Sequence, residues 1–196
     1  MRVVGIILAA GSSTRMGATN KLTTPWRGKP LVRHVADAVR ASNLAGGVLV
    51  TGHDNDAVLR AAKWTDGEDR LISVHNDDHR EGMAGSIVCG LDAAKMTNPD
   101  AVMILLGDMP LVQSTHIDQL IDTASGPTSG SIVIATNHGA WGNPVLFAAS
   151  QFDQLLSMTG DKGARSIIAG NRQRVTEVEI GEAASRDFDQ PSAFTP

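Results

Sequence analysis

Short apolar runs alternate with amphipathic segments along this chain, and this alternation restricts its fold more than any other feature of the sequence. The runs with the length and composition of buried strands are Val3–Ala9, Val48–Thr51, Leu71–His75, Ala101–Leu106, Ser131–Ala135, Val145–Phe147 and Val175–Ile180. The amphipathic segments predicted to be helices are Pro30–Ala41, Asp54–Ala62, Ser86–Ala94, Thr115–Thr123, Ser150–Ser157 and Ala164–Ala169. The alternation predicts an α/β fold with a mostly parallel sheet and helices on both faces.

Several predicted helices carry start signals. Pro30 suits a first helical position, where a backbone N–H needs no partner. Asp54 suits an N-cap, and Thr115 with Asp118 resembles a capping box in which Asp replaces the usual Glu or Gln.

The length of 196 residues predicts one domain, residues 1–196, with a substantial core. The sequence contains no repeat or linker, and the segment GPTSG at 126–130 is too short to separate domains.

A net charge of −4 argues against nonspecific binding to nucleic acid. A disulfide within the chain is excluded because Cys89 is the one cysteine, which suits a cytoplasmic location. Residues 3–10 are too short and too weakly flanked for a signal peptide, and no stretch approaches membrane-spanning length.

A loop rich in glycine, hydroxyl groups and cations follows the first predicted strand, at residues 11–21. Small residues let the backbone approach a ligand, so that N–H groups can point at phosphate oxygens, and Arg15 and Lys21 add positive charge. A P-loop requires the pattern G-x-x-x-x-G-K-[ST]. The loop does not fit it, because Gly17 lies one residue too far from Gly11 and Ala18 stands in place of the Lys. It is no dinucleotide fingerprint either, because Ser13 replaces the second glycine.

The loop resembles L-A-A-G-x-S-x-R-M-G…K, the signature of the MobA/MocA-like nucleotidyltransferases, whose resemblance extends from Ile6 to about Phe194. The resemblance implies a three-layer Rossmann-like nucleotidyltransferase fold, and it implies that Arg15 and Lys21 neutralise the leaving pyrophosphate. The alternative is an ordinary Gly/Ser turn. The implied nucleotide-binding residues of this region are Ala9, Ala10, Gly11, Ser12, Ser13, Thr14, Arg15, Gly17 and Lys21.

Asp108 leaves the buried run Ala101–Leu106, where a carboxylate is costly unless it is solvated, paired or bound to a cation. Mg²⁺ prefers one or two carboxylates plus phosphate oxygens, so Asp108 is predicted to be a metal ligand and catalytic. The alternative is that Asp108 only caps the turn before Pro110. Asp189 matches the central Asp of the D-x-D-T-P-E-D element in the cytidylyl-transferring branch and is the second predicted ligand. The chain departs from this element at Gln190, Ser192 and Ala193. The alternative there is an exposed acidic turn.

In related transferases the loop after the third predicted strand holds the nucleobase and ribose, and the matching residues are Asn76, Ala84, Gly85 and Ser86. An Asn side chain offers the donor and the acceptor that a base edge requires. The alternative is a polar surface loop with a helix cap at Ser86. His53 follows the second predicted strand and is interpreted as structural. The six histidines show no zinc-binding spacing, and G-x-S-x-G is absent.

Two later segments, 142–147 and 159–165, look like the G-[NH]-P-V-L-F and G-D-x-G-A-R elements that border the acceptor pocket of molybdopterin cytidylyltransferases. The implied acceptor-binding residues are Trp141, Gly142, Asn143, Asp161, Lys162 and Arg165. Lys162 and Arg165 could hold the acceptor's phosphate, or they could be solvated charges at a helix start. Trp141 stands where relatives often carry a basic or small residue, so it could stack on a flat acceptor or narrow the pocket.

Together these resemblances imply Mg²⁺-dependent transfer of CMP from CTP to molybdopterin, with release of pyrophosphate. GTP or another NTP remains open as the donor. The resemblance also suggests a molybdenum hydroxylase or its maturation chaperone as a partner. Two other classes stay open: an oxidoreductase related to family members that act on nicotine-derived pigments, and a non-catalytic chaperone for the molybdenum cofactor. The missing G-x-G-x-x-G counts against the oxidoreductase.

Overall fold

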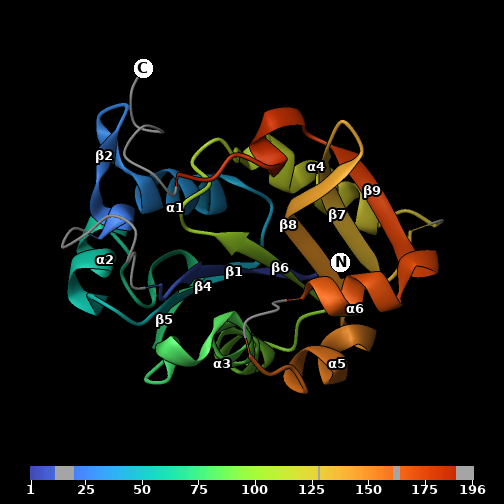
Figure 1. The fold of residues 1–196 in the computed structure, drawn as a ribbon, viewed down its shortest axis with the longest axis horizontal. Coiled ribbons are helices and arrows are strands. Elements are labelled where there is room, and N and C mark those ends of the chain that lie inside the picture. The colour runs from blue at the N-terminus through green and yellow to red at the C-terminus, as the bar shows by residue number, and fades with distance from the viewer. Residues whose placement is uncertain (12–19, 128, 161–163, 189–196) are drawn as a thin grey trace.

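The computed structural model of the chain describes residues 1–11, 20–127, 129–160 and 164–188. Within these residues the main sheet has the order β5-β4-β1-β6-β8-β7-β9, and only β8 runs against its neighbours (Figure 1). Its strands are β1 Val3–Ala9, β4 Gly46–Thr51, β5 Leu71–His75, β6 Ala101–Leu106, β7 Ile132–Asn137, β8 Ala140–Ala148 and β9 Val175–Glu179. The predicted mostly parallel α/β sheet is confirmed.

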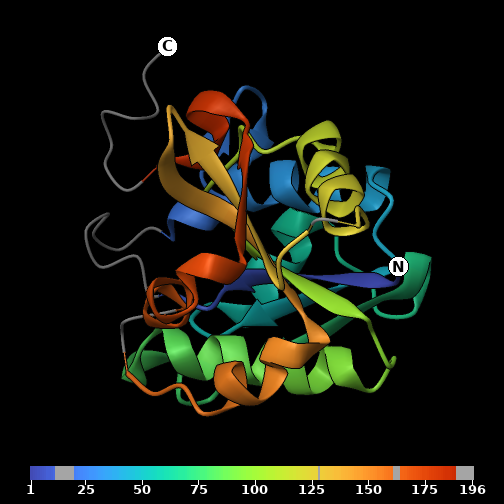
Figure 2. The same cartoon turned by 90° about the vertical axis from the view of Figure 1, so that its right-hand side faces the viewer.

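Helices cover both faces of the sheet and make three layers, as the two ribbon views show (Figure 1, Figure 2). The helices are α1 Leu31–Ala41, α2 Asn55–Ala62, α3 Met83–Lys95, α4 Ser114–Ala124, α5 Phe152–Leu156 and α6 Arg165–Gly170. One core cluster joins α1, α2 and α4 to one face of the sheet, and a second cluster joins α3, α5 and α6 to the other. The predicted three-layer arrangement is therefore confirmed.

Helix α3 packs unusually close to the centre of the sheet. A side chain at Gly90 would collide with Ile6 on β1 and Val50 on β4. The missing side chain lets the helix backbone approach these two strands. This close packing holds α3, whose first turn borders both cavities described below, against the centre of the sheet.

Several local predictions at helix starts are wrong. The predicted capping box of Thr115 and Asp118 does not form, because α4 begins one residue earlier and uses other partners. The backbone N–H of Gln113 donates to Nδ1 of His116 at 3.2 Å, and burial lowers the pKa of His116, which favours the neutral, accepting ring. Asp118 instead accepts a hydrogen bond from the backbone N–H of Asn43 at 2.7 Å.

Two other helix starts, those of α1 and α3, also differ from the expectation, whereas the predicted N-cap position of α2 is confirmed. Helix α1 begins at Leu31, with Pro30 at its N-cap. Asp54 does occupy the N-cap of α2, but its φ of 56° is left-handed and its side chain makes no capping hydrogen bond. Helix α3 begins at Met83, so Ser86 lies inside it and does not cap it.

Strand β8 is longer than the predicted strand Val145–Phe147 and forms a hairpin with β7. Glu179, at the end of β9, stabilises the turn of this hairpin by hydrogen bonds. Its carboxylate accepts hydrogen bonds from the backbone N–H groups of His138, Gly139 and Gly181 and from the Thr136 hydroxyl, at 2.8 to 3.3 Å. The bond from His138, followed by the others, lowers the pKa of Glu179 to about 2.

A short hairpin of β2 Pro25–Trp26 and β3 Lys29–Pro30 was not predicted, and its turn at Arg27 and Gly28 has two positive φ angles, 46° and 80°. Membrane-spanning segments are not found among the helices of the described residues, none of which is long and apolar enough.

Candidate functional site

The parallel strands β1, β4, β5 and β6 end at the same edge of the sheet, and residues that follow β1, β5 and β6 line a first cavity there. Ala10, Gly11 and Asp108, which follow β1 and β6, line a hollow of about 430 Å³ that we call the first-loop cavity. Ligands of open α/β sheets bind at this edge. Its described lining residues are Leu8, Ala9, Ala10, Gly11, Lys21, Leu22, His79, Arg80, Gly82, Met83, Ser86, Leu106 and Asp108.

Lys21 and Asp108 form an ion pair in this cavity, with Nζ and Oδ2 separated by 2.5 Å. Their side chains are only 16% and 15% exposed, so water screens the pair weakly. Lys21 begins a 3₁₀ helix, Lys21–Thr23, because Oδ1 of Asn20 caps the backbone N–H of Leu22 at 3.0 Å. The sequence predicted both residues of the pair for the catalytic site, and the structure brings them together across 87 positions of the chain.

The first-loop cavity has the donor chemistry of a magnesium site that a phosphate ligand would complete. Among the residues that the structure describes, no group of three or more His, Cys, Asp or Glu side chains could hold a metal ion without help. Asp108 offers one carboxylate beside a cation-lined cavity, and Mg²⁺ usually takes one or two carboxylates plus phosphate oxygens and water. The residues present therefore fit Mg²⁺ bound together with a nucleotide.

Several predicted site residues fall outside the described ranges. They are Ser12, Ser13, Thr14, Arg15, Gly17, Asp161, Lys162 and Asp189. Their predicted contacts with nucleotide, acceptor and metal stay predictions.

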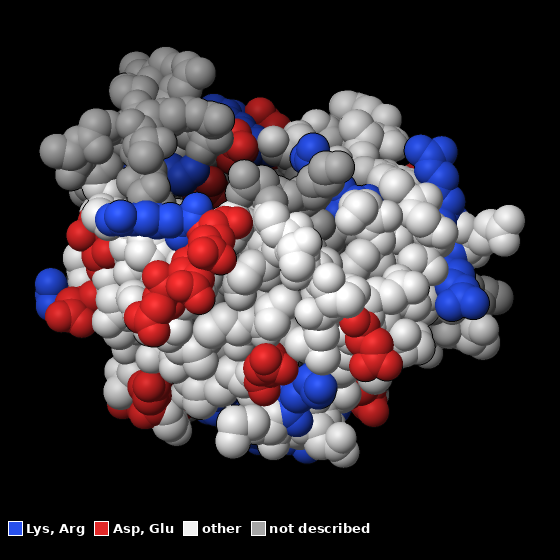
Figure 3. Space-filling model, turned by 60° about the horizontal axis from the view of Figure 1, so that its bottom comes forward, with Lys and Arg blue, Asp and Glu red and all other residues white. Residues whose placement is uncertain are grey.

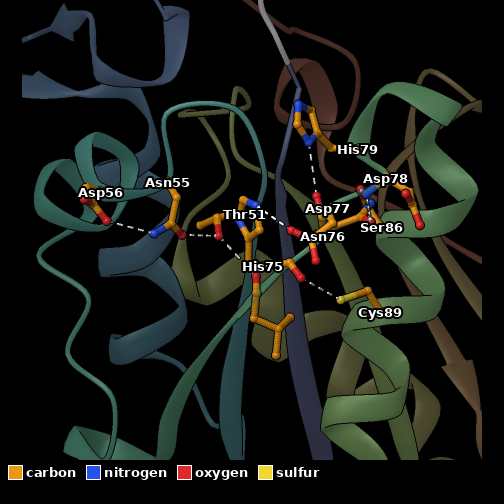
Figure 4. A network of polar contacts seen from close by, with 11 residues as sticks. Thr51, Asn55, Asp56, His75, Asn76, Asp77, Asp78, His79, Ser86 and Cys89 are labelled. Carbon is orange, nitrogen blue, oxygen red and sulfur yellow. Dashed lines mark hydrogen bonds and ion pairs between the residues drawn. The ribbon is translucent and has the colours of Figure 1, made fainter.

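Asn76 joins the loop after β5 to helix α3 (Figure 4). Its side-chain amide donates to Oγ of Ser86 at 3.0 Å, and its Oδ1 accepts from the backbone N–H of Asp78 at 3.1 Å. Asn76 is 7% exposed and is not among the cavity's lining residues, whereas Ser86 is. The structure thus gives Asn76 a supporting contact with the cavity wall, and the predicted base contact stays untested.

The histidines of this region lie around the same loop. Nδ1 of His79 is 3.1 Å from the backbone oxygen of Asn76, and His79 lines the first-loop cavity (Figure 4). His53 pairs with Asp54 at 3.3 Å and does not line the cavity. His79 was missed from the sequence, and its position four residues after the predicted strand Leu71–His75 is the one signal that could have indicated it.

Four of the predicted acceptor residues, Trp141, Gly142, Asn143 and Arg165, meet at a second and larger cavity of about 940 Å³. We call it the β8 cavity, because Trp141 to Phe147 of strand β8 contribute much of its wall. Its lining is mainly apolar. The described lining residues are Met83, Ile87, Ile104, Leu106, Ile134, Trp141, Gly142, Asn143, Val145, Phe147, Ala164, Arg165, Ser166, Ile168, Ala169 and Asp187.

Met83 and Leu106 line both cavities, so the first-loop cavity and the β8 cavity adjoin. The backbone N–H of Ala84, in the first turn of α3, donates to the carbonyl oxygen of Gly160 at 3.2 Å. Gly160 has a φ of 75°, a conformation that favours glycine. Two segments predicted for different substrates, at 84–86 and 159–165, are therefore in direct contact.

Gly142 serves packing in this structure. A side chain there would collide with the backbone carbonyl of Ala184, in the 3₁₀ helix Gly181–Ala184 that lies against β8. On the face brought forward in Figure 3, separate groups of acidic and of basic side chains surround a central area of uncharged residues.

Comparison with known proteins identifies the family of this chain. A model of the MobA-like NTP transferase domain matches residues 5–177. The chain belongs to the MobA-like NTP transferase family. The prediction of a nucleotidyltransferase with a Rossmann-like fold is thereby confirmed. The match does not identify the nucleotide donor or the acceptor.

Individual relatives support this assignment. The purine catabolism protein PucB of Bacillus subtilis (strain 168) is 28% identical over 98% of this chain and 94% of its own length. The bifunctional protein GlmU of Agrobacterium fabrum is 32% identical over 59% of this chain, which spans only 25% of that protein. The crystal structure of Rv0371c from Mycobacterium tuberculosis H37Rv is 27% identical and covers 99% of this chain and 95% of its own, with a TM-score of 0.81. A complex of Rv0371c with manganese covers 99% and 96% at 22% identity, with a TM-score of 0.75.

Proposed function

We propose that this protein transfers CMP from CTP to the phosphate of molybdopterin and releases pyrophosphate, in a reaction that requires Mg²⁺. The observation that carries the proposal is the pair of adjoining cavities. The first-loop cavity contains the Lys21–Asp108 pair, and the β8 cavity contains Trp141, Asn143 and Arg165. A nucleotide in the first and an acceptor in the second would meet at Met83 and Leu106.

The residues of the first-loop cavity suit the donor half of this reaction. Lys21, with Arg15, would bind the triphosphate and neutralise the leaving pyrophosphate. Asp108, with Asp189, would hold Mg²⁺, which when bound supplies positive charge to phosphate oxygens. The acceptor phosphate then attacks the α-phosphorus in line, the bond to pyrophosphate breaks, and alignment of the two substrates provides much of the rate.

The lining of the β8 cavity favours a flat acceptor. Trp141 and Phe147 are aromatic, and most of the other lining residues are aliphatic. Aromatic rings stack on one another, whereas the hydroxyls of a hexose need many hydrogen-bonding partners. Arg165, with Lys162, would hold the acceptor's phosphate, since a guanidinium can donate two hydrogen bonds to it. We place the enzyme in the cytoplasm, acting as a single domain that supplies a molybdenum hydroxylase or its maturation chaperone.

The test is a pyrophosphate-release assay with each of the four NTPs and Mg²⁺, with molybdopterin, with N-acetylglucosamine 1-phosphate, or with no acceptor. We expect release with CTP and molybdopterin, and its loss in Asp108→Asn. Release with the sugar phosphate and none with molybdopterin would overturn the acceptor, and preference for another NTP would overturn the donor. If no combination of NTP and acceptor releases pyrophosphate, the proposed transfer reaction is overturned.

A further inference from the structure

We infer that Glu177 and Arg172 are positioning residues that set the acceptor preference of the β8 cavity by holding the ring of Trp141. The inference rests on the proposed function, because it concerns the acceptor half of the same site. Neither Glu177 nor Arg172 follows from the motifs in the sequence.

The indole N–H of Trp141 donates to Oε1 of Glu177 at 2.7 Å. Indole has one donor and no acceptor, so this bond satisfies the whole polar capacity of the ring. A carboxylate acceptor makes such a bond shorter and stronger than a neutral one. The bond therefore restricts the rotation of the side chain about both of its torsion angles.

Arg172 provides the second restraint. Its guanidinium carbon lies 5.1 Å from the centroid of the Trp141 ring, within the range of a cation–π contact. Arg172 begins the 3₁₀ helix Arg172–Arg174, which leads directly into β9 and Glu177. One segment of the chain thus holds the ring both at its N–H and over its face.

The strand geometry explains how Trp141 on β8 reaches Glu177 on β9, two strands away in the sheet. Ile134 of β7 pairs with Val145, and Thr136 pairs with Trp141, so two steps along β7 correspond to four along β8. Irregularities of this kind re-aim side chains, and they occur often beside functional sites.

Trp141 lines the β8 cavity, whereas Glu177 and Arg172 are not among its lining residues. Apart from the charge that each carries, they influence a ligand in this cavity through the ring. A ring held in one position offers a flat ligand a surface without an ordering cost at binding. The same fixed ring limits the space for a puckered sugar, so its restraint should separate acceptors by shape.

The geometry is tested first in the ligand-free protein. Acrylamide quenching of tryptophan fluorescence should increase in Glu177→Ala and Arg172→Ala, and Trp141→Phe identifies the part of the emission that belongs to this ring. Glu177→Gln keeps an accepting oxygen but loses the charge, so its quenching should lie between that of the parent and that of Glu177→Ala. Arg174→Ala, in the same 3₁₀ helix, is the matched control for Arg172→Ala.

The function is tested by steady-state kinetics with CTP and molybdopterin. We expect the KM for molybdopterin to rise about three- to tenfold in Glu177→Ala and Arg172→Ala, with the KM for CTP changed less than about twofold. Arg174→Ala should match the parent, and Glu177→Gln should have an acceptor KM between those of the parent and Glu177→Ala. Activity of the parent with unaltered acceptor KM in both alanine variants would overturn the inference and leave the proposed function standing. An inactive parent would overturn the proposed function, and unchanged quenching would then overturn the inference separately.

Discussion

Replacing Lys21 with methionine removes a positive charge from the carboxylate that is proposed to hold the metal. In the ligand-free protein the ammonium of Lys21 lies 2.5 Å from Oδ2 of Asp108, where a divalent cation would have to bind. Methionine keeps most of the side chain's length and apolar stem. We therefore expect Lys21→Met to bind Mn²⁺ alone more tightly than the parent does, and to bind the Mn²⁺–CTP complex more weakly.

The size of the first effect follows from the contact that the metal must displace. A hydrogen bond to a charged group contributes a net ~1.5–3 kcal/mol, and ~1.4 kcal/mol corresponds to a tenfold change in affinity. The range is about 10- to 150-fold. Both side chains are only 16% and 15% exposed, so water screens the pair weakly and the whole of this range applies.

Free Mn²⁺ gives a strong EPR signal that is lost on binding, so titrations of the parent and of Lys21→Met measure the affinity directly. Lys29→Met is the control, because Lys29 pairs with Asp37 at 2.9 Å on the exposed surface. An affinity for Mn²⁺ alone that is equal or weaker in Lys21→Met would refute the competition between ammonium and metal. Tighter binding of Mn²⁺–CTP in the same variant would refute the role of Lys21 in binding the triphosphate.

Three further predictions concern other parts of the molecule. Asp108→Asn keeps the shape but removes the metal-binding charge, so kcat should fall at least about a hundredfold, or roughly 3 kcal/mol; near-parental turnover in the folded variant would remove Asp108 from the metal site. Arg165→Lys loses the planar fork and should raise the KM for molybdopterin several-fold without changing that for CTP; the reverse pattern would exchange the two halves of the site. The folded-state pKa of Glu179 is about 2, below its ordinary 4.5, so its contribution to stability is present above about pH 4.5 and is lost as the pH falls toward 2. In thermal melts, the Tm of the parent should exceed that of Glu179→Gln by an amount that decreases across that pH range. A difference in Tm that stays constant from pH 7 to pH 2 would contradict this cause.

The sequence predicted the strands of the parallel part of the sheet because their apolar runs are buried on both faces, as in β1 and β6. It did not predict contacts that depend on distant partners. The start of α3 at Met83 is fixed partly by the bond from Ala84 to Gly160, which no local pattern contains. The Arg27-Gly28 turn, in contrast, had a local signal in its glycine.

The same division applies to the candidate site. Lys21 and Asp108 each followed a recognisable motif, and parallel strands ending at one edge brought them together. Glu177 is an exposed residue of the half-buried strand β9, and no local pattern marks it. Its contact with Trp141 depends on the irregular pairing of β7 with β8, which the sequence does not predict.

Helix α3 has a consequence for how the two substrates would affect each other. Its first turn contributes Met83 to the walls of both cavities, and the bond from Ala84 to Gly160 ties that turn to the segment leading to Arg165. A shift of this turn alters both cavities at once, so the two binding equilibria share one mechanical element. If CTP changes the affinity for the acceptor by some factor through this turn, the acceptor must change the affinity for CTP by the same factor. If the same movement of this turn favours both substrates, each substrate binds more tightly when the other is already bound than when it binds alone.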